Sequence, residues 1–183
     1  MRSLGLDVGD KRTGVAVSDP RGILAIPLTV LAEKDEDATI DEILKLVEQY
    51  EAERIVVGLP RCLSGEIGAQ ASKVTAFAEK LRNAIANWGS QSYSSYHSEG
   101  EKQPKNLTQG KLRERAARQS HLSRVDIQLW DERLSTVAAE KLMIEAGTKR
   151  SKRKSNLDAM AAAFILQGFL DSLEDSSGSV CSD

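Results

Sequence analysis

The sequence has few cysteines, few aromatic residues and no long apolar run. Its two cysteines, Cys62 and Cys181, lie far apart without metal-ligand spacing, which indicates reduced thiols in a cytoplasmic protein. Aromatic residues make up 4% of the chain, too few to suggest a stacking platform for single-stranded nucleic acid. No apolar run reaches the ~18 residues of a membrane span, and the N-terminus shows a strand pattern where a signal peptide would stand. We therefore expect a soluble, cytoplasmic protein.

The chain also lacks a dominant charge. A net charge of −2 gives no general attraction to polyanions, so a nucleic-acid partner must be met by a local basic patch. At 183 residues, with 40% hydrophobic residues, the chain is long enough for one domain that buries about 70% of its unfolded surface. No sequence feature specifies an oligomeric state.

The apolar pattern predicts an α/β domain with a mixed five-stranded sheet and helices on both faces. Strand-like runs lie at residues 4–9, 11–19, 23–31, 54–60 and 125–130. Helical periodicity predicts helices at residues 38–51, 74–85, 135–146 and 156–173. Pro27 cannot donate a ladder hydrogen bond, so the third run is expected at a sheet edge. Strands followed by alternating helices and strands are typical of one layered domain, here residues 1–173.

A polar segment interrupts this pattern. Residues 87–124 lack apolar periodicity until Leu112 and are too long for an ordinary loop, which predicts a partly disordered insertion. The segment is either a solvated linker or, because it is rich in lysine and arginine, an accessory nucleic-acid arm. Its two histidines, His97 and His121, are expected at the surface. Residues 174–183 are expected to form a flexible polar tail.

One acid, Asp7, stands at the end of the first strand. It follows buried-type apolar residues, and the chain returns as a second strand after a short turn, so Asp7 lies at the rim of a hairpin. A buried charge is costly unless it is paired or binds a metal. The alternative is an aspartate that only accepts hydrogen bonds from turn amides.

Two further acidic positions occur near strand and helix ends. Asp131 and Glu132 directly follow the fifth strand, where open α/β sheets place their sites. Alternatively, Glu132 pairs with Arg133 and Asp131 caps the next helix. Asp158 completes a Ser155 capping box, yet it also shares the apolar, alanine-rich helix face that packs on the sheet.

Together these acids predict an oxygen-ligand site for Mg²⁺ or Mn²⁺ that suits two-ion phosphodiester hydrolysis. The choice between Asp131 and Glu132 stays open, because it depends on a one-residue phase. A basic run precedes Asp158 at Lys149, Arg150, Lys152, Arg153 and Lys154. We expect Lys152, Arg153 and Lys154 to bind substrate phosphates, although a solvated loop is the simpler alternative.

These segments resemble the YqgF/RuvX family of Holliday-junction-resolvase-like nucleases, which have an RNase H-type fold. The matching blocks follow the family's order: Leu6-Asp7-Val8-Gly9 with Gly14-Val15-Ala16-Val17-Ser18-Asp19, Val57-Gly58-Leu59-Pro60 with Gly65, Asp131-Glu132-Arg133-Leu134-Ser135-Thr136, and Leu157-Asp158 with Ala161-Ala162 and Ile165-Leu166.

The resemblance implies a metal-dependent nuclease that trims the 5′ end of precursor 16S rRNA, within the small-subunit precursor of the ribosome. It implies catalytic and metal-binding roles for Asp7, Glu132 and Asp158, and a phosphate contact for Arg133. Three other functions remain open: a resolvase of branched DNA, a non-catalytic RNA-binding assembly factor, and an ATP-binding phosphotransferase of the actin and sugar-kinase kind. The last needs two such domains, which 183 residues cannot supply. RNA and branched DNA present the same phosphates, so the residues alone do not separate them.

Overall fold

A computed structural model describes residues 1–32, 35–60, 68–94, 124–131 and 150–177. Within these residues, five strands form one sheet in the order β3-β2-β1-β4-β5. The strands are β1 (Arg2–Val8), β2 (Thr13–Ser18), β3 (Ala25–Leu31), β4 (Ala52–Leu59) and β5 (Asp126–Asp131). The first three pair antiparallel, whereas β1, β4 and β5 run parallel. The expected mixed sheet is confirmed, with β3 and its proline at an edge.

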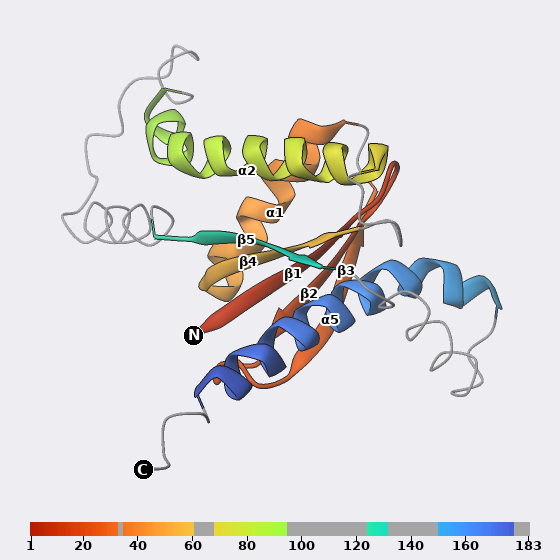
Figure 1. The fold of residues 1–183 in the computed structure, drawn as a ribbon. Coiled ribbons are helices and arrows are strands. Elements are labelled where there is room, and N and C mark those ends of the chain that lie inside the picture. Colours follow the sequence, from red (N-terminus) through yellow and green to blue (C-terminus); the bar gives the residue numbers. More distant parts are fainter. Residues whose placement is uncertain (33–34, 61–67, 95–123, 132–149, 178–183) are drawn as a thin grey trace.

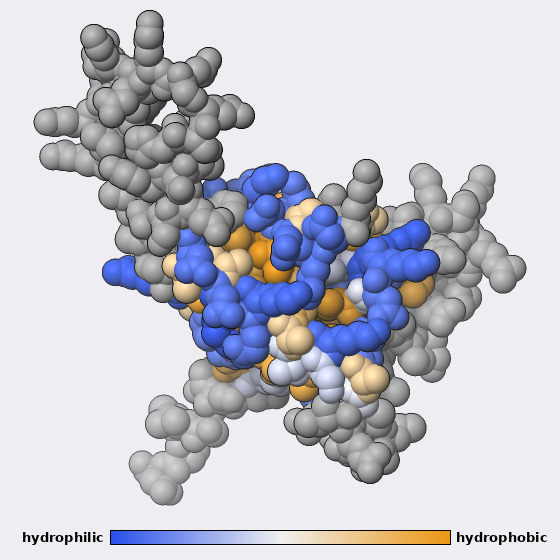
Figure 2. Space-filling view, turned by 90° about the horizontal axis from the view of Figure 1, so that it is seen from above, coloured by the Kyte–Doolittle hydropathy of each residue, from blue (hydrophilic) through white to orange (hydrophobic). Residues whose placement is uncertain are grey.

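Helices cover both faces of the sheet (Figure 1). The described helices are α1 (Glu36–Tyr50), α2 (Ala69–Ser94) and α5 (Arg150–Ser177). α1 and α2 share one face, and α5 crosses the other. Viewed from the α2 side, the surface is mainly hydrophilic, with hydrophobic side chains visible between charged ones (Figure 2). None of the helices in these ranges is long and apolar enough to cross a membrane.

The two faces of the sheet are packed differently. Large side chains such as Leu6, Ile43 and Leu81 fill the core under α1 and α2. The core under α5 has fewer buried residues and includes several alanines. A Cβ atom at Gly5 of β1 would lie only 2.7 Å from the carbonyl oxygen of Ala162. The backbone of α5 therefore lies almost directly on β1, because the residues on both sides of this contact are small.

Three predicted boundaries are wrong. α5 begins at Arg150, so Ser155 lies inside the helix and is not its N-cap, and Arg150 to Lys154 belong to the helix itself. Lysine and arginine are good helix formers, and no glycine or proline interrupts the sequence between Gly147 and Gly168. α2 also continues to Ser94, into the segment expected to be an insertion, and α5 continues to Ser177, into the expected tail. The remaining insertion, the helix expected at 135–146 and the last residues lie outside the described ranges.

Candidate active site

Asp7 and Asp158 meet on the α5 face of the sheet. Asp7 is directly opposite Gly14 in the pairing of β1 with β2. A Cβ atom at Gly14 would lie 1.9 Å from the carbonyl oxygen of Asp158 and 2.9 Å from the amide nitrogen of Ala159. Because Gly14 has no side chain, the turn of α5 that carries Asp158 can pack against the strand position facing Asp7.

Burial and a neighbouring acid both disfavour the charged form of Asp7. Loss of solvent raises the pKa of Asp7 to about 6, and the negative charge of Asp158 adds to the increase. If Asp7 only capped the turn, it would accept a hydrogen bond from a turn amide. The amide of Gly9 instead donates to the carbonyl oxygen of Arg12 at 2.9 Å. Two neighbouring carboxylates repel each other unless a proton or a cation lies between them. Their hard oxygen atoms fit a divalent cation such as Mg²⁺.

The end of β5 reaches the same edge of the sheet. β5 is separated from β1 by β4 alone, so the backbones of β1 and β5 lie about 10 Å apart, twice the usual strand spacing. Trp130 faces α5, where its ring packs edge-on against Phe169 with centroids 5.5 Å apart. Asp131 is opposite Leu59, which packs in the core under α1 and α2. Asp131 therefore faces away from Asp7.

The other expected site residues are only partly covered. Glu132 and Arg133 lie outside the described residues. Lys152, Arg153 and Lys154 lie in the early turns of α5, and Lys154 precedes Asp158 by about one turn. In the part of the chain that the structure describes, no group of three His, Cys, Asp or Glu side chains is placed to hold a metal. Of the three acids expected as ligands, the described residues include Asp7 and Asp158, which lie near each other.

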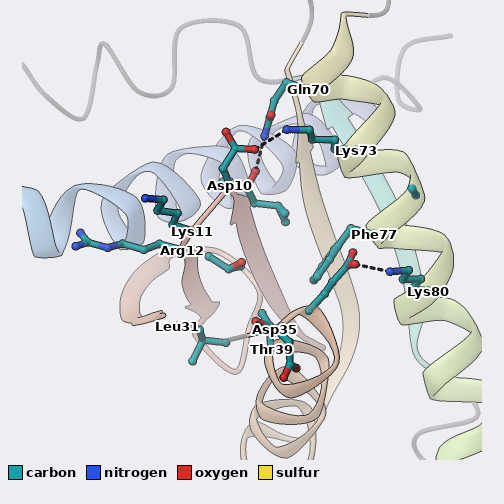
Figure 3. A pocket seen from close by; sticks show the side chains of 15 residues that line it. Asp10, Lys11, Arg12, Leu31, Asp35, Thr39, Gln70, Lys73, Phe77 and Lys80 are labelled. Carbon is teal, nitrogen blue, oxygen red and sulfur yellow. Dashed lines mark hydrogen bonds and ion pairs between the residues drawn. The ribbon is translucent and has the colours of Figure 1, made fainter. Parts of the chain in front are cut away.

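A pocket of about 480 Å³ lies beside the β1–β2 turn, on the α2 side (Figure 3). Its lining is rich in charged residues, and several of the charges pair with one another. Lys73 Nζ lies 2.8 Å from Asp10 Oδ1, and Lys80 donates to Glu36. Lys73 and Lys80 are neutralised in this way, whereas Lys11 and Arg12, which also line the pocket, extend away from α2. Sequence reasoning missed it, because its walls come from segments far apart in the chain.

Sequence comparisons relate the chain to known proteins. The sequence model of the RuvX family, described as Holliday junction resolvase, matches residues 1–114 and 93–172. A protein of Desulforamulus reducens is 39% identical over 172 residues, covering 94% of this chain and 98% of that protein. One from Clostridium botulinum (strain Hall) is 38% identical over 173 residues, covering 94% and 98%. Both bear the name "Putative pre-16S rRNA nuclease".

The fold is similar to that of a solved resolvase. The structure titled T. thermophilus RuvC in complex with Holliday junction substrate aligns with a TM-score of 0.51. The alignment covers 96% of this chain and 97% of the other, at 13% sequence identity. A similarity at this identity supports the RNase H-like architecture, while the family match rests on the sequence comparisons.

Proposed function

Because this chain belongs to the RuvX family, we propose that it is a metal-dependent endonuclease that cleaves precursor 16S rRNA in the cytoplasm. The observation that carries the proposal is the meeting of Asp7 and Asp158 at the carboxyl edge of the sheet. A half-buried aspartate with only a structural role would be expected to pair with a cation. The pKa of Asp7 is instead raised by burial and by a second carboxylate, that of Asp158. This pairing is typical of a site that binds cations.

The acids would hold the metal, and the basic residues would hold the substrate. We assign Asp7, Asp158 and Glu132 as ligands of Mg²⁺ or Mn²⁺, and prefer Glu132 to Asp131 because Asp131 faces the opposite side of the sheet. When bound, such ions activate water and neutralise the charge that develops on the phosphate and the leaving oxygen. Arg133, Lys152, Arg153 and Lys154 would contact phosphates of the rRNA within the small-subunit precursor.

The test is cleavage of an RNA that carries the 5′ leader of precursor 16S rRNA by the purified protein with Mg²⁺ or Mn²⁺. Asp7→Asn, Asp158→Asn and Glu132→Gln should each reduce cleavage by roughly 100-fold or more, since a metal supplies several kcal/mol to the transition state. Asp131→Asn is the matched control on the other face and should retain cleavage. If wild-type protein binds the leader and never cuts it with either metal, the protein is a non-catalytic assembly factor.

A four-way DNA junction provides the second arm of the same experiment. The description of the matching family and the similarity to RuvC favour branched DNA as the alternative substrate. Phosphate contacts do not distinguish the two nucleic acids, so the comparison requires rates on both substrates under one set of conditions. Faster cleavage of the junction than of the leader would replace the rRNA assignment with a resolvase.

A further inference from the structure

The turn between β1 and β2 carries two cations close to the acids. Residues 9–12 are exposed, begin two positions after Asp7 and end two positions before Gly14, against which the Asp158 turn packs. At about 3.4 Å per strand residue, Arg12 lies about 7 Å along the chain from Gly14. In a duplex, each strand places one charge per ~3.4 Å of helix axis, so a distance of about 7 Å corresponds to one or two phosphates.

The turn is held in place by the first turns of α2. Gln70 donates from Nε2 to the carbonyl oxygen of Val8 at 3.2 Å, and Lys73 bonds Asp10 at 2.8 Å. The hydrogen bond and charge of Lys73 keep the pKa of Asp10 below its ordinary value. Lys73 and Asp10 are 63% and 67% exposed, so this ion pair adds little to the stability of the fold. Its effect is on where Asp10 points and on the charge that the turn presents.

The three charged side chains of the turn point in different directions (Figure 3). Asp10 faces Lys73 on α2, whereas Lys11 and Arg12 extend away from α2. Arg12 precedes Gly14 by two positions, and alternation along the strand places it toward the face that carries Asp158. Asp10 is thus paired on the α2 side of the turn, and the side chains of Lys11 and Arg12 extend to the other side.

We propose that Lys11 and Arg12 form a binding site for a backbone phosphate of the substrate, next to the phosphate held at the acids. Lys73 is a positioning residue of this site, because it neutralises and retains Asp10, which would otherwise repel the same phosphate. This proposal depends on the proposed function in one respect, namely that the ligand is a nucleic acid.

The test measures binding without cleavage. A fluorescently labelled RNA stem-loop with single-stranded flanks is titrated with metal-free protein across a range of salt concentrations, and the matching DNA is titrated in parallel. For the double variant Lys11→Gln/Arg12→Gln, the slope of log affinity against log salt should become shallower by about 1.4, at about 0.7 per lost single-strand contact. Lys45→Gln removes an exposed lysine from α1 and is the matched control, with an unchanged slope. An unchanged slope in the double variant overturns the proposal.

A second set of variants tests the role of Lys73. Lys73→Gln should weaken binding by about twofold to threefold, as expected for an exposed ion pair. Adding Asp10→Asn to it should restore binding, because the charge that needed neutralising is gone. If binding is not restored, Lys73 acts through the fold or contacts phosphate itself, and the positioning role is wrong.

The outcome is separable from that of the proposed function. Loss of binding in the Lys11 and Arg12 variant supports the phosphate site even when wild-type protein cuts nothing. Cleavage by wild-type protein, together with unaltered binding by the variant, supports the nuclease and overturns the phosphate site. Equal effects on RNA and DNA fit a phosphate contact, whereas an effect on RNA alone would replace it with recognition of the ribose.

Discussion

At the scale of single residues, the free energy of the fold depends on the protonation of Asp7. Its pKa is about 6 in the folded chain against an ordinary value of 3.8. Between these values the folded chain binds more protons than the unfolded chain, so stability falls as the pH rises from about 4 to about 6. Above pH 6, Asp7 is charged in the folded chain and lowers the free energy of unfolding by its full amount. A pKa shift of this size corresponds to about 3 kcal/mol at most.

Asp7→Asn should therefore stabilise the metal-free protein at pH 8 by about 1–3 kcal/mol, since a neutral amide has no charge to desolvate or to repel Asp158. At pH 4, which is below the folded-state pKa of about 6, Asp7 is protonated in the folded chain and has no charge to desolvate, so the two proteins should differ little. Urea unfolding at the two pH values measures both differences. A variant that is less stable than wild type at pH 8 would mean that Asp7 forms a favourable interaction in the folded chain.

Gly14 sets how closely the Asp158 turn approaches the sheet. Gly14→Ala would place a Cβ atom 1.9 Å from a carbonyl oxygen of α5, and the helix must move away. We expect a loss of about 1–3 kcal/mol in unfolding free energy and weaker Mn²⁺ binding by calorimetry. Gly168→Ala is the matched control on the same helix. Its Cβ atom would meet Trp130 at an ordinary 3.5 Å, so it should gain about 0.5–1 kcal/mol from helix propensity. If Mn²⁺ binding survives Gly14→Ala, close approach at this position is not needed for the metal.

At the scale of elements, the position at which α5 begins determines whether Ser155 is a helix cap or an interior helix residue. A capping Ser155 would lose about 1 kcal/mol on replacement by alanine. Because α5 begins at Arg150, Ser155 is an interior helix residue, and Ser155→Ala should leave stability unchanged or raise it by up to about 0.5 kcal/mol. Asp35 is the positive control, since its side chain accepts from the amide of Ala38 at 2.7 Å. Asp35→Ala should lose about 1 kcal/mol in the same unfolding measurement, and an equal loss for Ser155→Ala would contradict the observed helix start.

Elements with strong local signals could be predicted from the sequence. The proline at position 27 predicted the sheet edge, and the apolar runs predicted all five strands within a few residues. The start of α5 was missed because Ser155 to Asp158 fits a cap locally, while the preceding basic residues are equally compatible with a helix. Local sequence gives no reason to prefer one over the other.

Of the candidate site, the sequence predicted the residues that carry local signals and missed the contacts that depend on packing. Strand ends and helix periodicity placed Asp7 and Asp158 toward one site, because these signals are local. The face of Asp131 depends on the register of β5 against β4, and the sequence carries no signal for that register. The anchoring of Asp10 by Lys73 joins residues 63 positions apart, and only the packing of α2 on the sheet reveals it.

At the scale of the whole molecule, the unequal faces of the sheet determine where the site can be. Large side chains hold α1 and α2 away from the sheet, whereas glycine and alanine let α5 lie close. Among the described residues, it is on the α5 side that a helix acid, Asp158, comes close to a strand acid, Asp7. The parallel run of β1, β4 and β5 then brings the carboxyl ends of three strands to the same edge. A shared cation at this edge would link the helix to the sheet and stabilise the whole domain.

Metal binding should therefore stabilise the protein in a pH-dependent way. At pH 8, Mg²⁺ or Mn²⁺ at a hundred times its dissociation constant should add about 2.7 kcal/mol, and chelation should remove it. Below about pH 6, a proton must leave Asp7 before the cation binds, so affinity should fall by up to about tenfold per pH unit. Calorimetric titration from pH 5 to pH 8 measures this dependence, with Asp7→Asn as the control that has no proton to lose at that position. An affinity that does not change between pH 5 and pH 7 would mean that the cation binds without Asp7, and the shared site would have to be assigned to other residues.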